Sequence, residues 1–304
     1  MALATDYRPK NLSEFEGNEA IKASLKSKLS LPSDKRPHVY LFSGPKGCGK
    51  TTLARITATS LKCSDREFTE IDASDDSGGV TAIRELKRTV RYPPMVGDVR
   101  VWFIDEAHLV TGKGQEAFLK ILEEPPAYAY FILATTDPQK LTKTLKDRCI
   151  TFEVKPLTDK EMNVFLSDII EREDVEIPAD VLKKIVSDCN GHPRAALQML
   201  EKIIDLPVKD MKKAVEDSAE SETQVIDFCR AMMKPKASWK EIAPMLKTLS
   251  GEPESNRHAI RGYCSSILLS GQDNAKAALI LEYFKDKYMD KNDFILATYQ
   301  VFMG

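Results

Sequence analysis

A glycine-rich segment near the start of the chain carries the strongest chemical signal. Residues 44–51 (GPKGCGKT) fit the pattern GxxxxGK[ST], follow the apolar run HVYLF and precede a helical pattern that begins at Lys50. Glycines let backbone N–H groups close around phosphates, the Lys50 ammonium group neutralises β- and γ-phosphate oxygens, and the Thr51 hydroxyl can ligate Mg²⁺. We therefore expect ATP and Mg²⁺ to bind at Gly44, Pro45, Lys46, Gly47, Cys48, Gly49, Lys50, Thr51 and Thr52.

Two carboxylates follow the next strongly apolar run. Val101 to Ile104 (VWFI) reads directly into Asp105 and Glu106. Ligands of α/β proteins bind outside the carboxyl ends of parallel strands, so we expect Asp105 to hold Mg²⁺ and Glu106 to polarise an attacking water. An isolated Asp-Glu pair is more often a solvated helix start. Beside a phosphate-binding loop, the catalytic interpretation is favoured.

A later apolar run, YFILA, ends in Thr135 and Thr136. Their hydroxyl groups can position the same water or contact a γ-phosphate. Threonine is also a good β-former, and two threonines at a strand end need no function.

Alternating strand and helix patterns must position these residues. Between residues 38 and 154 the runs HVYLF, FTEID, VRVWFID and YFILATT alternate with helical patterns that begin at Lys50, Val80 and Gly114. Such alternation predicts an α/β core with a mainly parallel sheet. From Thr158 onward the pattern is helical only, with LTDKE as a helix-start signal and Pro178 opening another helix.

Three domains follow from this pattern. We expect a nucleotide-binding core at residues 1–157, a small helical lid domain at 158–217 and a helical collar domain at 218–304. The acidic stretch EDSAESET, residues 216–223, is the predicted linker between the last two domains.

Composition narrows the function classes. The 44 Lys and Arg residues nearly balance 46 Asp and Glu residues, for a formal net charge of −2, so no global field favours nucleic acid. The six cysteines are scattered without a CxxC pair, which argues against a zinc ribbon or a disulfide framework. The sequence starts without an apolar signal-peptide region and has no apolar run of about 18 residues, so we expect no membrane association and a cytoplasmic location.

Several motifs together resemble one family. The P-loop GPKGCGKT, the sequence DEAH at 105–108, and ATTDPQKL at 134–141 followed by DRC at 147–149 resemble AAA+ sliding-clamp-loader ATPases. KILEEPP at 120–126 is similar to bacterial DNA polymerase III gamma/tau subunits, whereas YRPKNLSEFEGNE at 7–19 and ASDD at 73–76 resemble replication factor C small subunits. The similarity covers roughly residues 5 to 200. Bacterial gamma/tau chains carry a zinc-binding cysteine cluster after the P-loop helix, where this chain has only Cys63, so we expect no zinc module.

The resemblance assigns further catalytic roles. It makes Thr136 the sensor 1 position and Arg148 an arginine finger that reaches the ATP of a neighbouring subunit. Asp147 stands where the family has serine, and spacing alone would make Arg148 an ordinary surface arginine. The sequence Gly191-His192-Pro193-Arg194 resembles sensor 2, which places Arg194 near the γ-phosphate of its own subunit. The implied catalytic set is Lys50, Glu106, Thr136, Arg148 and Arg194; we interpret His192 as structural.

The resemblance also implies base and DNA contacts. Tyr7 and Arg8 match the signature that wraps the nucleotide, and Phe15, Glu16 and Gly17 stand where the family has its adenine-side loop. The helix after residues 74–79 is implied to contact template phosphates at its start and to point toward the clamp at its far end. Exposed N–H groups at the helix after DEAH would grip the DNA backbone without reading sequence. The predicted DNA contacts are Arg84, Lys87, Thr111, Lys113 and Gln115, although Lys87 and Lys113 equally fit a solvated surface.

Taken as a member of that family, the chain would be an ATPase subunit of a pentameric loader that opens a sliding clamp and places it on primer-template DNA. Two alternatives stay open. One is another AAA+ motor, such as a branch-migration helicase or a protein unfoldase, against which the lack of an aromatic-hydrophobic-glycine pore loop between Thr69 and Val99 argues. The other is a structural subunit that binds nucleotide without hydrolysis, a case that loss of Lys50, Glu106 or Arg148 would mark. The compact chain with mixed features would suit a viral or otherwise divergent replisome.

Overall fold

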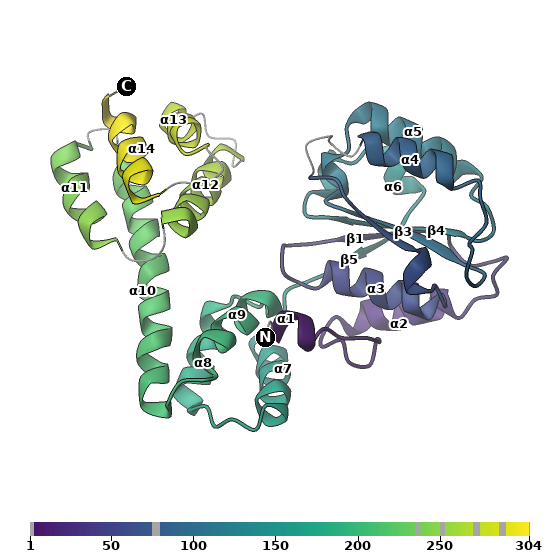
Figure 1. Cartoon of the computed structure of the whole chain (residues 1–304), viewed down its shortest axis with the longest axis horizontal. Coiled ribbons are helices and arrows are strands. Elements are labelled where there is room, and N and C mark those ends of the chain that lie inside the picture. Colours follow the sequence, from purple (N-terminus) through teal and green to yellow (C-terminus); the bar gives the residue numbers. More distant parts are fainter. Residues whose placement is uncertain are drawn as a thin grey trace. The chain divides into compact units, whose positions relative to one another are not determined.

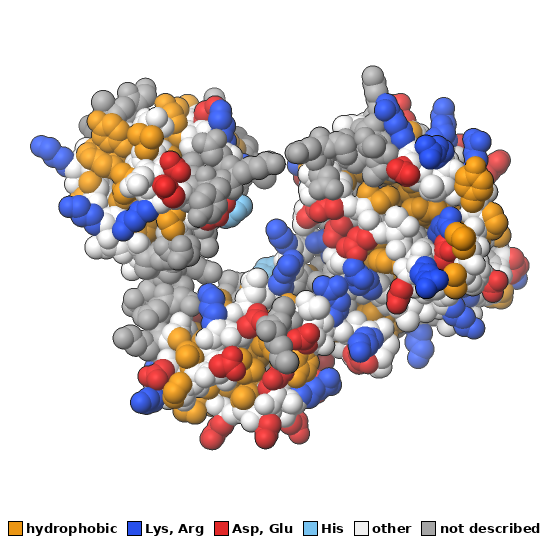
Figure 2. Space-filling model, in the orientation of Figure 1, with side chains coloured by type: hydrophobic (Ala, Val, Ile, Leu, Met, Phe, Trp, Pro, Cys, Tyr) orange, Lys and Arg blue, Asp and Glu red, His pale blue; other side chains and the backbone are white. Residues whose placement is uncertain are grey.

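The computed structural model describes residues 3–74, 80–234, 237–249, 253–269, 274–285 and 290–303. The chain forms two compact units, Met1–Val208 and Lys209–Gly304. Figure 2 shows acidic and basic side chains interspersed over the visible face of each unit, in keeping with the near-zero net charge. No helix among the described residues has the length and apolar character needed to cross a bilayer.

A five-stranded parallel sheet forms the centre of the first unit, with the strand order β2-β3-β4-β1-β5. The strands are β1 (Val39–Ser43), β2 (Phe68–Asp72), β3 (Arg100–Asp105), β4 (Ala129–Thr135) and β5 (Ile150–Glu153). In β1 and β4 every residue is buried, because helices cover both faces of the sheet, and their sequences are accordingly continuous apolar runs. The predicted parallel α/β core is confirmed.

Helices cover both faces of the sheet (Figure 1). On one face α2 (Glu19–Leu29) and α3 (Lys50–Ser60) pack against Tyr40 and Phe42, and on the other α4 (Val80–Thr89), α5 (Gly112–Glu123) and α6 (Lys143–Asp147) pack against Val39 and Leu41. Successive residues of β1 therefore point to opposite cores. Short 3-10 turns, η1 (Asp65–Glu67), η2 (Ala107–Leu109) and η3 (Pro138–Lys140), complete the connections.

A small helical layer follows the sheet within the first unit. It contains α7 (Asp159–Arg172), α8 (Ala179–Asp188) and α9 (Pro193–Ile203), and the N-terminal α1 (Leu3–Asp6) packs against α9. The predicted helix start at LTDKE is confirmed, because Thr158 and Glu161 form a reciprocal capping box at the start of α7. Pro178 is the N-cap residue of α8, as expected.

The second unit contains five described helices. They are α10 (Val208–Met233), α11 (Trp239–Thr248), α12 (Pro253–Leu269), α13 (Ala275–Tyr283) and α14 (Lys291–Met303), and they share a core that includes Phe228, Ile260, Ile280 and Phe294. The expected linker at 216–223 lies instead inside α10. EDSAESET contains neither glycine nor proline, so nothing in it ends a helix. The three-domain division at residues 157 and 217 stays a prediction.

Candidate functional site

A cavity of about 710 Å³ opens at the carboxyl ends of the strands in the first unit. That volume is within the range of about 300–1,000 Å³ typical of small-molecule sites. Its walls come from the N-terminal segment, the P-loop, the ends of β3 and β4, and the start of α9. The predicted residues that line it are Tyr7, Arg8, Phe15, Glu16, Lys46, Gly47, Cys48, Gly49, Lys50, Thr51, Thr52, Asp105, Glu106, Thr136 and Arg194.

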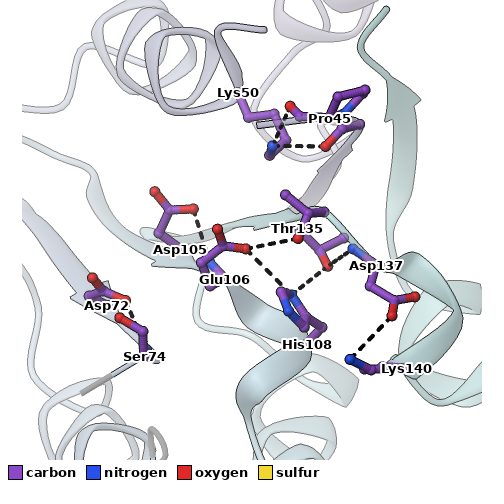
Figure 3. A network of polar contacts seen from close by, with 12 residues as sticks. Pro45, Lys50, Asp72, Ser74, Asp105, Glu106, His108, Thr135, Asp137 and Lys140 are labelled. Atoms are coloured by element: carbon purple, nitrogen blue, oxygen red, sulfur yellow. Dashed lines mark hydrogen bonds and ion pairs between the residues drawn. The ribbon is translucent and has the colours of Figure 1, made fainter. Parts of the chain in front are cut away.

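The P-loop connects β1 to α3 through a turn that requires glycine. Gly47 and Gly49 have φ values of 83° and 94°, in the left-handed region that side chains avoid. Lys50, the first residue of α3, donates from Nζ to the carbonyl oxygens of Gly44 at 2.8 Å and Pro45 at 2.9 Å (Figure 3). Neutral carbonyl oxygens are weaker partners for an ammonium group than anionic oxygens are. The arrangement therefore fits a phosphate group.

Burial also affects the pKa of Lys50. It lowers the pKa of the ammonium group, while the nearby carboxylates of Glu106 and Asp105 oppose that shift. A buried cation favours an anionic ligand in contact with it.

Two oxygen ligands for a cation lie beside the P-loop. Thr51 donates its hydroxyl to Oδ2 of Asp105 at 3.0 Å, and the backbone N–H of Glu106 donates to Oδ1 of the same carboxylate at 2.9 Å. These bonds orient the Asp105 carboxylate. Mg²⁺ prefers one or two protein oxygens supplemented by substrate phosphates and water, so Thr51 and Asp105 fit that ion.

Glu106 is held at a strained position next to the end of β4. Its φ of 47° and ψ of 43° are left-handed, at a cost of about 1–2 kcal/mol for a residue with a side chain. Thr136 donates its hydroxyl to Oε2 of Glu106 at 3.3 Å, and Nδ1 of His108 lies 3.4 Å from the same oxygen. The Thr135 hydroxyl oxygen lies 3.1 Å from the same Nδ1 and accepts from the N–H of Asp137 (Figure 3).

The predicted pair Glu106 and Thr136 is thus brought together. Sequence reasoning assigned no role to His108, which joins Glu106 to the end of β4. Its position as the last residue of DEAH was the available signal.

The lid contributes a third wall. Arg194 is the second residue of α9, and a Cβ added to Gly47 would lie 3.5 Å from Cβ of Arg194. Sγ of Cys48 lies 3.2 Å from Nδ1 of His192, and burial raises the pKa of the Cys48 thiol. Arg194 therefore reaches the P-loop of its own chain. The contact between Cys48 and His192 was not predicted.

The N-terminal segment closes the remaining side. Tyr7 donates its hydroxyl to Oε1 of Glu173 at 2.6 Å, and this bond raises the pKa of Tyr7. The Phe15 ring packs under the P-loop, where a Cβ added to Gly49 would come within 2.8 Å of it. Gly17 is not among the lining residues, although it packs against Leu157, which does line the cavity.

The predicted arginine finger lies outside this cavity. Arg148 ends α6 as its C-cap residue, and Nη2 lies 3.4 Å from Oε1 of Glu123. Both side chains are about half exposed, at 44% and 53%. An exposed pair of this kind is worth about 0–1 kcal/mol, so Arg148 is free to exchange its partner.

The predicted DNA contacts differ in their surroundings. Arg84 and Lys87 are exposed on α4, and Thr111 is the exposed N-cap residue of α5. Lys113 lies in the first turn of α5, and its side chain, like residues 75–79, lies outside the described residues.

Gln115 is a correction. Its side chain is only 3% exposed; Nε2 donates to the carbonyl oxygen of Val110 and Oε1 accepts from the N–H of Thr142. Its own backbone N–H donates to the carbonyl oxygen of Thr111. Gln115 therefore connects α5 to the segment after η3, and its amide is buried in that connection.

Comparison with known proteins finds sequence similarity to subunits of DNA polymerase III. The family model described as "DNA polymerase III, delta subunit" matches residues 66–158. The DNA polymerase III subunit gamma/tau of Mycobacterium tuberculosis is 36% identical over 67% of this chain and 39% of its own length. The subunit tau of Bacillus subtilis is 30% identical over 95% of this chain and 52% of its own length. The chain thus spans about half or less of these relatives.

Solved structures give the same fold. The Thermotoga maritima RuvB Holliday junction branch migration motor superposes with a TM-score of 0.59 at 23% identity, over 79% of this chain and 85% of that one. A variant of RuvB superposes with a TM-score of 0.60 at 21% identity, over 93% and 99%. The chain has the fold of an AAA+ P-loop protein, with an α/β core followed by helical domains. Within that fold its sequence resembles the clamp-loader subunits of the gamma/tau type.

Proposed function

We propose that this chain is an ATP-hydrolysing subunit of a DNA sliding-clamp loader, working in the cytoplasm with the replication machinery. The observation that carries the proposal is the convergence of Lys50, Asp105, Glu106 and Arg194 on one cavity. The identity of 36% with a gamma/tau subunit, over two thirds of the chain, supports the particular kind of motor.

The residues of the cavity have different roles in phosphoryl transfer. P-loop N–H groups and Lys50 hold the phosphates, and Thr51 and Asp105 hold Mg²⁺, which supplies neutralising charge at the phosphate oxygens. Glu106 polarises the attacking water from a position that Thr136 and His108 set. Arg194 contacts the γ-phosphate from the lid of the same chain.

Arg148 completes the site of a neighbouring subunit rather than its own. The proposal draws on its exposure and on its place outside the cavity. An arginine supplied from a second chain stabilises charge in the transition state and typically accelerates hydrolysis by about 10³–10⁵-fold. Hydrolysis would then depend on assembly, which the family resemblance puts at five subunits.

DNA and the clamp are proposed to contact different ends of the core. Exposed Arg84 and Lys87 on α4, with Thr111 and Lys113 at the start of α5, are proposed to follow the phosphate backbone of primer-template DNA. Such contacts are independent of base sequence.

The loop after α4 is the proposed contact for the clamp. Tyr92 is 67% exposed, Met95 91% and Val96 41%. Together these side chains expose apolar surface to water. The buried carboxylate of Glu67 accepts the N–H groups of Met95 at 2.7 Å and Val96 at 3.2 Å, so the loop is held in one shape. A preorganised apolar loop supports docking to a protein partner.

The test is steady-state ATP turnover by the chain together with its co-assembling subunits, alone and with primed DNA plus the clamp from the same source. We expect joint stimulation that disappears in Arg148→Ala. The matched control is Arg230→Ala, which removes another exposed arginine in an ion pair, with Asp227 on α10, outside the cavity. Turnover that ignores both DNA and clamp, in an assembly verified by mass, would refute the clamp-loader role.

The likeness to the branch-migration motor concerns the fold alone, since the identity is below 25%. The same assay separates that alternative, because stimulation by four-way junctions instead of the clamp would favour it. Nucleotide binding without any turnover would favour the structural subunit.

A further inference from the structure

One contact joins the P-loop directly to the lid. Sγ of Cys48 lies 3.2 Å from Nδ1 of His192, although 144 residues separate them in the sequence. Cys48 belongs to the loop that is proposed to hold phosphates and is only 3% exposed. His192 is the N-cap residue of α9, and Arg194 follows two residues later.

The first turn of α9 rests on the P-loop at this point. A Cβ added to Gly47 would lie 3.5 Å from Cβ of Arg194 and 3.8 Å from Cβ of His192, which is ordinary van der Waals contact. Pro193 occupies the first helical position, where its fixed φ angle rigidly joins His192 to Arg194. A displacement of His192 is therefore passed to Arg194.

The protonation of the two groups determines which of them donates the hydrogen bond. Burial raises the pKa of Cys48, so the thiol is protonated near neutral pH. The S–H group can donate to Nδ1 in the tautomer that leaves this nitrogen without a hydrogen. The His192 side chain makes no capping hydrogen bond to α9. Its Nδ1 contacts Cys48 of the P-loop instead.

We propose that Cys48 and His192 are a positioning pair that holds Arg194 against the P-loop and so raises the preference of the site for a nucleoside triphosphate over a diphosphate. The inference rests on the proposed function, because it takes Arg194 as the residue that contacts the γ-phosphate. A side chain that is already in place loses less conformational freedom when its ligand binds. The benefit falls on the γ-phosphate alone, since the N–H groups of the P-loop hold the others.

Equilibrium binding of ADP and of the non-hydrolysable analogue AMP-PNP, each with Mg²⁺, tests the pair by calorimetry on the full chain. The variants are Cys48→Ala, His192→Ala and their double mutant, with Arg194→Ala as the reference for complete loss of the contact. Cys48→Ser keeps a hydrogen-bond donor at this position and should therefore keep the preference for AMP-PNP over ADP. Cys264→Ala removes another buried thiol, in the core of the second unit, and is the matched control.

Each single variant should lower the ratio of the AMP-PNP affinity to the ADP affinity by about two- to tenfold, the range that one hydrogen bond allows. The double mutant should lower this ratio no more than either single variant does, because both remove the same bond. Cys48→Ser and Cys264→Ala should keep the wild-type ratio of the two affinities.

Three results would overturn the inference alone: equal losses for both nucleotides, additive losses in the double mutant, or single variants that bind both nucleotides as the wild type does. Equal losses would mean that the pair merely supports the P-loop. A wild-type chain that binds neither nucleotide would overturn the proposed function and this inference with it. Cys48→Ser also guards against misfolding, since its side chain is almost the same size.

Discussion

Replacing Glu67 by glutamine should lower the free energy of unfolding of the first unit more than the same substitution at an exposed glutamate. Glu67 is only 3% exposed and accepts hydrogen bonds from the backbone of Met95 and Val96 and from Nε of Arg100. The glutamine amide has one acceptor oxygen where the carboxylate has two. One of its donors would therefore face Arg100 or a backbone N–H.

The expected cost combines two effects. The charge-assisted bond to Arg100, whose side chain is 16% exposed, is lost, and one buried donor is left without a partner. An unsatisfied buried donor costs about 1–3 kcal/mol, so we expect a loss of about 2–3 kcal/mol in the free energy of unfolding of the first unit. The N–H of Arg100 lowers the pKa of Glu67 from its ordinary value of 4.5, so this stabilisation is present above pH 4.5 and is lost as the pH falls through the lowered pKa.

Urea unfolding followed by tryptophan fluorescence measures the loss. A Trp239→Phe background leaves Trp102 of β3 as the single tryptophan, so the signal reports the first unit. The matched control is Glu70→Gln on β2, whose exposed pair with Arg55 should contribute less than about 1 kcal/mol. Equal losses in Glu67→Gln and Glu70→Gln, or a difference that does not shrink as the pH is lowered, would refute the reasoning.

Three further predictions concern the site and the lid. Lys50→Ala should abolish calorimetric binding of ADP, because the P-loop then lacks its cation; retained binding would contradict the phosphate role. Glu106→Gln should keep nucleotide binding and lower turnover by about 10²–10⁴-fold, and unchanged turnover would remove Glu106 from the mechanism. Thr158→Ala breaks the capping box and should cost about 1 kcal/mol in urea unfolding at pH 7. The difference from wild type should shrink as the pH falls below 4.5, since hydrogen bonds from Thr158 lower the pKa of Glu161.

The core of the fold was predictable because its signals are local. The central strands β1 and β4 are buried along their whole length, so they appear in the sequence as unbroken apolar runs. The P-loop depends on glycines at fixed positions, and the start of α7 depends on a capping pair three residues apart. Each of these features can be recognised within a window of about ten residues.

Two of the differences arise where contacts distant in sequence decide the outcome. Gln115 follows a helix start and looks exposed, yet its amide oxygen accepts the N–H of Thr142, 27 residues later. Cys48 and His192 were interpreted separately, since nothing local indicates that two residues 144 positions apart are in contact. The acidic stretch at 216–223 is a local case: it looks like a linker because it is polar, but helix propensity rather than polarity decides whether α10 continues.

For Arg148, in contrast, the contacts within its own chain do not indicate a role. Lys50, Asp105, Glu106 and Arg194 converge on one cavity, whereas Arg148 is exposed and has only Glu123 as a weak partner. In the proposed mechanism, a site that lacks the arginine of a neighbouring chain binds ATP but turns it over slowly. The proposal thus separates binding, which one chain would perform, from hydrolysis, which would need a neighbour. Assembly on DNA and clamp would then control when ATP is hydrolysed.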